Sequence, residues 1–192
     1  MNSKTTISEK TTLSTKQKLK ESFLTLYSEK PLSGITIASI TKKAGYNRCT
    51  FYNYYDDISC LLDEIEDELI GQIQEKLLEL PENTIPYNLD MFFSQMLISF
   101  EKYGKTLYIL LSKNGNAAFR QRLNKILKQH FRRLHANTIE DKKLEYILSF
   151  AISAGIGLME HWYETGKKES MEDFLSFAQS LVANGIIGVT SS

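Results

Sequence analysis

The chain lacks the features that mark disulfide-stabilised, zinc-binding or membrane-spanning proteins. Its two cysteines, Cys49 and Cys60, make no disulfide framework, and their separation matches no common spacing of zinc ligands. No apolar run reaches the roughly 18 residues that a membrane helix requires. The first residues are polar and rich in Thr and Ser, without the apolar segment of a secretory signal, so we expect a cytoplasmic protein with no membrane partner.

Signals of catalysis are equally sparse. The three histidines have no acidic or cysteine partners at ligand spacing, and His130 and His135 are five residues apart, which takes them off a shared helical face. The sequence contains no phosphate-binding loop, nucleophile elbow or dinucleotide fingerprint. We therefore expect no enzyme activity, no metal site and no cofactor.

Net charge is also absent, but the average hides two segments of opposite sign. The chain has 23 basic and 23 acidic residues. Residues 1–55 contain nine basic and three acidic residues, whereas residues 56–80 contain nine acids and one lysine. Such asymmetry is typical of a short unit that binds a polyanion, joined to a body with another purpose.

Proline and glycine are sparse, and apolar residues recur at spacings of three and four, which predicts an all-α protein. A length of 192 residues suits one small unit joined to a larger one. We expect a flexible tail at 1–14, a three-helix unit at 15–62 whose connecting helix continues to about residue 80, and a larger helical unit at 82–190.

Residue types near the amino end predict a helix-turn-helix. A first helix is expected to begin after Ser14 or Thr15, either of which can cap it. Thr36 can cap a second helix, and Gly45 can end it because glycine adopts the left-handed conformation that a helix end favours. Asn47 is then placed to cap a third helix.

The third helix divides into two faces. Phe51 and Tyr55 are four residues apart and share the face that would pack on a small core. Arg48 and Tyr52 share another face, with Asn53 beside it, and these side chains can bond base edges or phosphates. Cys49, beside them, could sense oxidants or be a tolerated small residue. The predicted partner is double-stranded DNA.

The segment 36–62 resembles the DNA-binding domain of TetR-type transcriptional regulators. In that family a second helix ending in Ala-Gly leads to a recognition helix of the form Thr-Phe-Tyr-x-Tyr-Phe, which appears here at 50–55 as TFYNYY. The resemblance extends over residues 16–62. It implies DNA contacts at Thr36, Arg48, Thr50, Tyr52, Asn53 and Tyr54. We add the neighbouring Lys42, Lys43 and Cys49 as candidate DNA-binding residues.

Two positions depart from the family pattern. Tyr46 replaces a small aliphatic residue after the glycine, and Ile58 replaces a lysine that holds a phosphate at the start of the fourth helix. Asp56 and Asp57 would repel DNA there. Any phosphate clamp is therefore expected to depend on Lys42, Lys43, Arg48 and the basic first helix.

The larger unit resembles, more loosely, the regulatory domain of a Gram-positive TetR subgroup, through the segments 100–123 and 155–170. Its Met- and Phe-rich stripes could enclose an apolar or aromatic ligand, or could be plain core. The candidate ligand-binding residues are Phe92, Met96, Tyr103, Tyr108, Phe119 and Trp162.

Small residues in the segment 144–162 indicate that another helix approaches closely. Packing on the last helix, and on the same pair of helices in a second subunit, predicts a homodimer. The candidate interface residues are Ala151, Ala154, Gly155, Leu158, Phe174, Ala178, Leu181 and Val182.

These observations favour a dimeric repressor that binds a palindromic operator and is released by a small-molecule or protein effector. Two alternatives remain. The effector or partner could instead promote DNA binding and activation, or the protein could be an interaction module whose degenerate helix-turn-helix no longer reads DNA.

Overall fold

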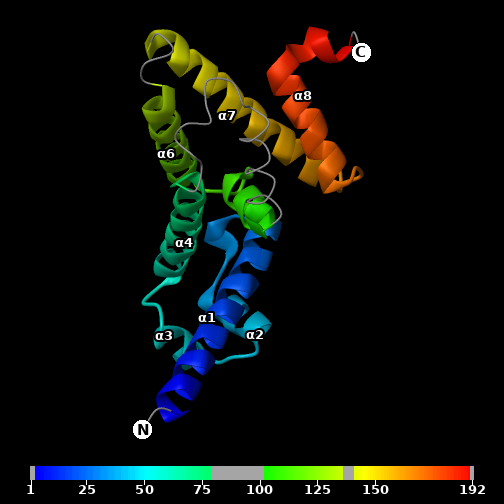
Figure 1. Cartoon of the computed structure of the whole chain (residues 1–192). Coiled ribbons are helices and arrows are strands. Elements are labelled where there is room, and N and C mark those ends of the chain that lie inside the picture. The colour runs from blue at the N-terminus through cyan, green and yellow to red at the C-terminus, as the bar shows by residue number, and fades with distance from the viewer. Residues whose placement is uncertain (1–2, 79–101, 136–140, 191–192) are drawn as a thin grey trace. The chain divides into compact units, whose positions relative to one another are not determined.

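The computed structural model describes residues 3–78, 102–135 and 141–190, and every regular element in these ranges is a helix. The chain forms two compact units (Figure 1). We call Met1–Glu68 with Lys113–Gly115 the head, and Leu69–Ser112 with Asn116–Ser192 the body. The all-α class predicted from the sequence is thus confirmed for the described residues, and none of their helices is long and apolar enough to cross a bilayer.

The elements follow one another in a simple order (Figure 1). The head contains α1 (Ser3–Glu29), the 3-10 turn η1 (Leu32–Gly34), α2 (Ile37–Ala44), α3 (Arg48–Tyr52) and the first half of α4 (Ile58–Leu78). The body contains the end of α4, a helical segment at 102–111, α6 (Ala117–His135), α7 (Asp141–Glu164) and α8 (Met171–Thr190).

Helix α1 begins at Ser3, well before the start after Ser14 or Thr15 that the sequence suggested. The segment 3–14 contains no proline or glycine to end a helix. A Ser or Thr inside a helix can direct its hydroxyl to a carbonyl one turn back, so a residue type that favours caps does not require one. Thr15, a candidate cap, is instead a buried residue within α1.

The caps of α2 and α3 are confirmed. The side chain of Thr36 accepts a hydrogen bond from the backbone N–H of Ser39, and the Ser39 hydroxyl accepts one from the backbone N–H of Thr36, both at 3.1 Å. Gly45 ends α2 with φ of 77°, in the left-handed region. Asn47 Oδ1 accepts from Thr50 N at 2.8 Å, which starts α3 two residues after the glycine.

A small apolar core fills the head. In α1 it includes Leu19, Phe23 and Tyr27, with the two rings 5.2 Å apart. The remaining elements contribute Ile35, Ile40, Phe51, Tyr55, Leu61, Leu62 and Ile65. Each fully buried apolar side chain contributes about 1.5–3 kcal/mol, so this cluster accounts for the packing of the short helices α2 and α3.

The body has its own core, centred on Trp162 of α7. Its ring stacks on Phe174 of α8 at 4.9 Å, and its Nε1 donates to the Glu169 carbonyl at 3.2 Å. Arg120 of α6 is bonded to Glu160 of α7 at 2.6 Å, which joins those two helices. Helix α7 ends where Gly166 and Lys167 both adopt positive φ, 83° and 53°.

Candidate nucleic-acid interface

Helix α3 presents two chemically different faces. Phe51 is fully buried and Tyr55 is 4% exposed, with their rings 5.5 Å apart. Tyr52 is 57% exposed, and Arg48 and Asn53 are exposed beside it. The division of faces predicted from the sequence is confirmed. The five-residue helix and its C-cap Asn53 thereby offer guanidinium, phenol and amide groups to solvent, while Phe51 within the helix and Tyr55, three residues beyond its end, fix it to the head.

The two threonine hydroxyls predicted to contact DNA also form hydrogen bonds at the starts of α2 and α3. Thr36 takes part in the capping box of α2, and Thr50 Oγ1 donates to Asn47 Oδ1 at 3.1 Å. Thr36 is exposed, whereas Thr50 and Tyr54 are half-buried. Such hydroxyls position a helix end, and any phosphate they meet also meets the positive end of the helix dipole.

The basic residues that remain exposed lie on α1, α2 and α3. Within residues 14–68 the exposed cations are Lys18, Lys42, Lys43 and Arg48. Cys49 is also exposed, at the start of α3. The exposed surface of the helix-turn-helix is therefore basic, as the charge distribution along the sequence indicated.

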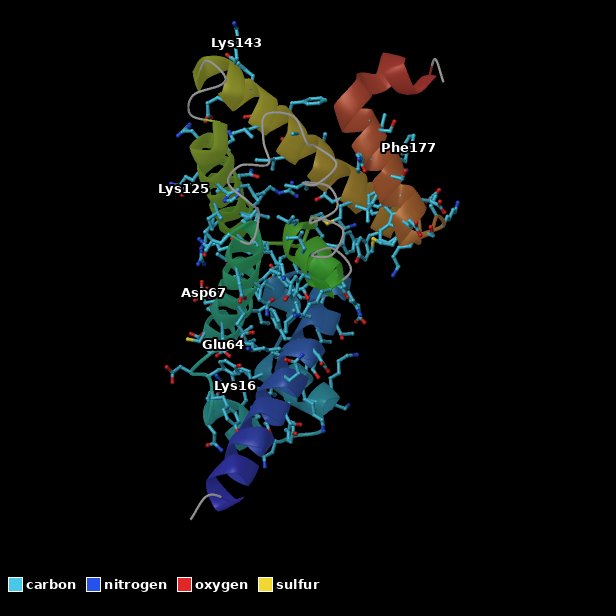
Figure 2. The ribbon with its side chains drawn as sticks, in the orientation of Figure 1. Lys16, Glu64, Asp67, Lys125, Lys143 and Phe177 are labelled. Carbon is cyan, nitrogen blue, oxygen red and sulfur yellow. The ribbon has the colours of Figure 1, made fainter. Side chains whose placement is uncertain are left out.

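The other described lysines of α1 are engaged with α4. Lys20 Nζ lies 2.6 Å from Glu64 Oε1 and 2.5 Å from Glu68 Oε1, and Lys16 Nζ lies 2.8 Å from Glu64 Oε2. Lys16 and Glu64 are labelled where α1 meets α4 in Figure 2. The phosphate clamp was expected to depend partly on the basic first helix, and two lysines of that helix are paired with acids of α4.

These contacts fix the charge state of Glu64. Burial by itself raises the pKa of the Glu64 carboxyl, but the hydrogen bonds from Lys16 and Lys20 outweigh it and hold the pKa below its ordinary value of 4.5. Burial, and then the Glu64 carboxylate, raise the pKa of the neighbouring Tyr55. Glu64 is thus an anion, and Tyr55 a neutral phenol, at neutral pH.

The start of α4 is closed by an acid. Asp57 Oδ1 accepts a hydrogen bond from the backbone N–H of Cys60 at 2.9 Å, and this bond holds the pKa of Asp57 below its usual value. An aspartate at this position stabilises a helix start. Asp57 therefore has a structural reason to be present, and with Ile58 half-buried the start of α4 offers DNA no cation.

Tyr46 was noted as a departure from the family pattern, but its neighbours could not be read from the sequence. Its ring lies 5.9 Å from Lys18 Nζ, and its hydroxyl lies 3.5 Å from Thr15 Oγ1. The backbone N–H of Tyr46 donates to the Thr41 carbonyl at 2.8 Å, which closes the turn between α2 and α3. The tyrosine connects this turn with α1.

Comparison with known proteins supports the reading of the fold. Residues 87–184, just over half of the chain, match a TetR family model described as "Transcriptional regulator C-terminal region". The chain belongs to the TetR family. A search of curated proteins finds no match.

Solved TetR-family structures share the fold. A TetR transcriptional regulator from Streptococcus agalactiae 2603V is 21% identical with a TM-score of 0.59, over 93% of this chain and 99% of that one. The fatty acid degradation regulator FadR from Bacillus halodurans is 12% identical with a TM-score of 0.67, over 90% and 96%. A TetR-like regulator from Rhodococcus sp. RHA1 is 16% identical with a TM-score of 0.67, over 91% and 96%.

For the residues of this TetR-family body that are predicted to bind a ligand, the structure gives the burial and ring contacts of four. Phe92 and Met96 lie outside the described residues. Phe119 and Trp162 are buried, and the half-buried Tyr108 stacks on Tyr163 at 4.5 Å. Tyr103 is half-buried, with Lys102 Nζ 4.9 Å from its ring centre. Ligand binding at these positions stays a prediction.

A cavity of about 280 Å³ lies elsewhere, between the end of α4 and the middle of α6. It is lined by Gln74, Leu77, Leu78, Ile126, Gln129 and His130. The sequence analysis did not identify this space, because it depends on how the end of α4 and the middle of α6 pack together. No group of three or more potential metal-binding side chains occurs among the described residues.

Two of the predicted dimer-interface residues already pack inside the protomer, and the interface itself stays a prediction. Phe174 and Ala178 are buried within the chain, where Phe174 stacks on Trp162. The side chain of Val182 lies outside the described residues. The remaining predicted positions are all half-buried: Ala151, Ala154, Gly155, Leu158 and Leu181.

The exposed stripe of α7 is the adjacent one. Tyr146 is 80% exposed and Phe150 is 64% exposed, and Ser153 and Gly157 continue the same face at spacings of three and four. Phe177 of α8 is also exposed (Figure 2). Small residues predicted from the sequence that another helix approaches α7. They could not show which side of α7 is already covered by α6 and α8 within the protomer.

Proposed function

We propose that this TetR-family protein is a transcriptional repressor that binds a palindromic operator as a homodimer and is released by an effector. The observation that carries the proposal is the two-faced recognition helix. Arg48, Tyr52 and Asn53 are exposed, while Phe51 and Tyr55 are buried. Exposed aromatic and amide groups on a helix fixed by its other side are suited to the major groove.

The head has the charge that this role requires. The lysines at the end of α2 and the arginine at the start of α3 are exposed, and they lie on the two elements of the helix-turn-helix. Phosphate contacts from such residues set orientation, and contacts from Arg48 and Asn53 to base edges would set sequence preference. The acid at Asp57 does not argue against DNA binding, because it caps α4.

The dimer is proposed to form through the exposed stripe of α7 with Phe177 of α8. Two large aromatic side chains of this stripe, Tyr146 and Phe150, are solvent-exposed in the protomer, and exposed apolar patches mark interaction sites. A Cβ added at Gly155 or Gly157 would meet no heavy atom within 4 Å in the described part of the chain. The close approach that these glycines permit is thus left for a second copy.

Two recognition helices related by a two-fold axis would enter successive major grooves about 34–36 Å apart. An effector would act by favouring one separation of the two helices, which either matches or misses this spacing. The cavity between α4 and α6 is a candidate place for a small effector, with apolar walls from Leu77, Leu78 and Ile126 and polar groups from Gln74 and Gln129.

A gel-shift titration tests the proposal. The probe is a palindromic duplex from the promoter beside the protein's own gene, and binding is followed from about 50 to 200 mM salt, the range over which phosphate contacts weaken strongly. The protein should shift the duplex at low salt and release it as salt rises. The double variant Arg48→Ala with Tyr52→Ala, which changes exposed residues alone, should fold and fail to shift.

The same materials separate the competing functions. Transcription from this promoter in vitro should fall when protein is added, whereas a rise would identify an activator. Failure to shift at any salt would refute DNA binding and favour a protein-interaction module. Sedimentation of the free protein tests the dimer, which the variant Phe150→Glu should convert to monomer.

A further inference from the structure

The lysines of α1 point to two sides of the helix. Lys16 and Lys20 are one turn apart and both contact the acids of α4. Lys18 is two residues from each, about 200° around a helix with 3.6 residues per turn. Lys18 is exposed and pairs with no carboxylate in the described part of the chain. One lysine of this group is therefore directed away from α4.

Tyr46 lies on that other side. Lys18 Nζ is 5.9 Å from the centre of the Tyr46 ring, and the tyrosine hydroxyl reaches Thr15 one turn earlier in α1. A ring face attracts an ammonium group, which favours this position of a long and otherwise mobile side chain. Tyr46 directly precedes Asn47, the cap of α3. The ammonium group is thus held beside the start of the recognition helix.

The first turn of α4, at the other end of the helix-turn-helix, contains no basic residue. Ile58 is half-buried at the start of α4, and the carboxylate of Asp57 occupies the backbone N–H of Cys60. Among the described side chains, the head therefore has an exposed ammonium next to the α2–α3 turn, whereas Lys16 Nζ, 5.3 Å from the centre of the Tyr55 ring before α4, is paired with Glu64.

We propose that Lys18, oriented by Tyr46, binds a DNA phosphate beside the recognition helix and supplies a phosphate contact that the start of α4 does not. The proposal rests on the proposed DNA-binding function. A lysine is suited to this task, because its ammonium is a compact charge on a flexible stem and does not read bases. Lys18 would add to affinity and to salt dependence, and would leave sequence preference unchanged.

The experiment compares wild type with Lys18→Gln and Lys16→Gln. Both variants lose one charge from the same helix, but Lys16 is paired with Glu64 and should not meet DNA. The logarithm of the association constant for the promoter duplex is measured against the logarithm of salt concentration. A phosphate contact contributes about 0.9 to the slope, or about eightfold in affinity at 0.1 M relative to 1 M salt.

Lys18→Gln should lower the slope by about 0.9 per bound protomer and should weaken a scrambled duplex to the same extent. Lys16→Gln should leave the slope unchanged. Equal loss in the two variants would show an effect of net charge alone and would overturn the proposal, as would an unchanged slope in Lys18→Gln. If wild type binds no duplex, the DNA-binding function itself fails and this proposal fails with it.

A second comparison tests the part assigned to Tyr46. The variant Tyr46→Val restores the small aliphatic residue typical of the family. It should weaken binding less than Lys18→Gln does, and the double variant should bind as Lys18→Gln alone, because the ring acts through the lysine. Additive losses would instead show that Tyr46 acts independently of Lys18. Far-UV circular dichroism of each variant checks that the head remains folded.

Discussion

Replacement of Lys20 by methionine tests the ionic contacts between α1 and α4. The side chain of Lys20 is 9% exposed, and its ammonium lies between Glu64 and Glu68. Methionine keeps an unbranched apolar stem of similar length and removes the charge. We expect Lys20→Met to lower the free energy of unfolding of the head by about 1–2 kcal/mol at pH 7.

The magnitude comes from opposing contributions. A hydrogen bond to a charged group contributes about 1.5–3 kcal/mol to stability. We apply this range to the contact between Lys20 and Glu64. The Glu68 contact adds about 0–1 kcal/mol, because that side chain is half exposed. The variant no longer buries an ammonium, which offsets part of the loss, and Glu64 keeps its contact with Lys16.

The effect should depend on pH in a defined direction. The pKa of Glu64 is below 4.5 in the folded protein, so its charge contributes fully to stability above its unfolded value and the contribution is lost as pH falls through the folded pKa. The difference between wild type and Lys20→Met should therefore hold from pH 7 to about pH 5 and shrink below about pH 4.

Urea unfolding followed by circular dichroism, with hydrogen exchange of the α1 and α4 amides, provides the measurement. The matched control is Lys18→Met, which changes an exposed lysine of the same helix and should alter stability by less than about 0.5 kcal/mol. Equal destabilisation by the two variants, or a difference that does not change with pH, would refute the assignment of stability to the ionic contacts.

Three further outcomes are expected. Asn47→Ala removes the cap of α3 and should lower head stability by about 1 kcal/mol, measured by urea unfolding, and Asn47→Asp should restore most of it. Phe51→Ala should destabilise the head by about 3–5 kcal/mol. Tyr52→Ala should change stability by less than about 0.5 kcal/mol, yet it should reduce DNA binding in a gel shift. A larger loss of stability in Tyr52→Ala than in Phe51→Ala would contradict the assignment of faces. Phe150→Glu should shift the sedimentation coefficient to that of a monomer, and an unchanged value would remove the exposed stripe of α7 from the dimer interface.

Local features of the head could be predicted from sequence because short-range chemistry determines them. Thr36, Gly45 and Asn47 each act within three residues of their own position, so residue type and spacing are sufficient. The burial of Phe51 and Tyr55 follows from the helical period in the same way.

Contacts between distant segments could not be predicted. The contact between Lys16 and Glu64 joins residues 48 positions apart, and no local pattern distinguishes Lys16 from Lys18. The start of α1 was misplaced because Ser and Thr favour caps without requiring them.

The body shows a similar limit. Small residues predicted close approach along α7, but the sequence could not show that Phe174 and Ala178, two of the predicted interface residues, pack inside the protomer. Of the residues considered for ligand binding, Tyr108 stacks on Tyr163 and Trp162 stacks on Phe174, and ligand binding there stays a prediction. The spacing of apolar residues identifies the buried side of a helix, but it does not identify which helix packs against that side.

In the short recognition helix, the residues that stabilise the fold differ from the residues proposed to contact DNA. Its fold depends on the buried rings of Phe51 and Tyr55, whereas Arg48, Tyr52 and Asn53 are exposed. Mutations at Arg48, Tyr52 or Asn53 can therefore change which DNA target is bound with little effect on thermal stability. Descendants of such a protein can therefore change their target genes by single substitutions, and each intermediate protein remains folded.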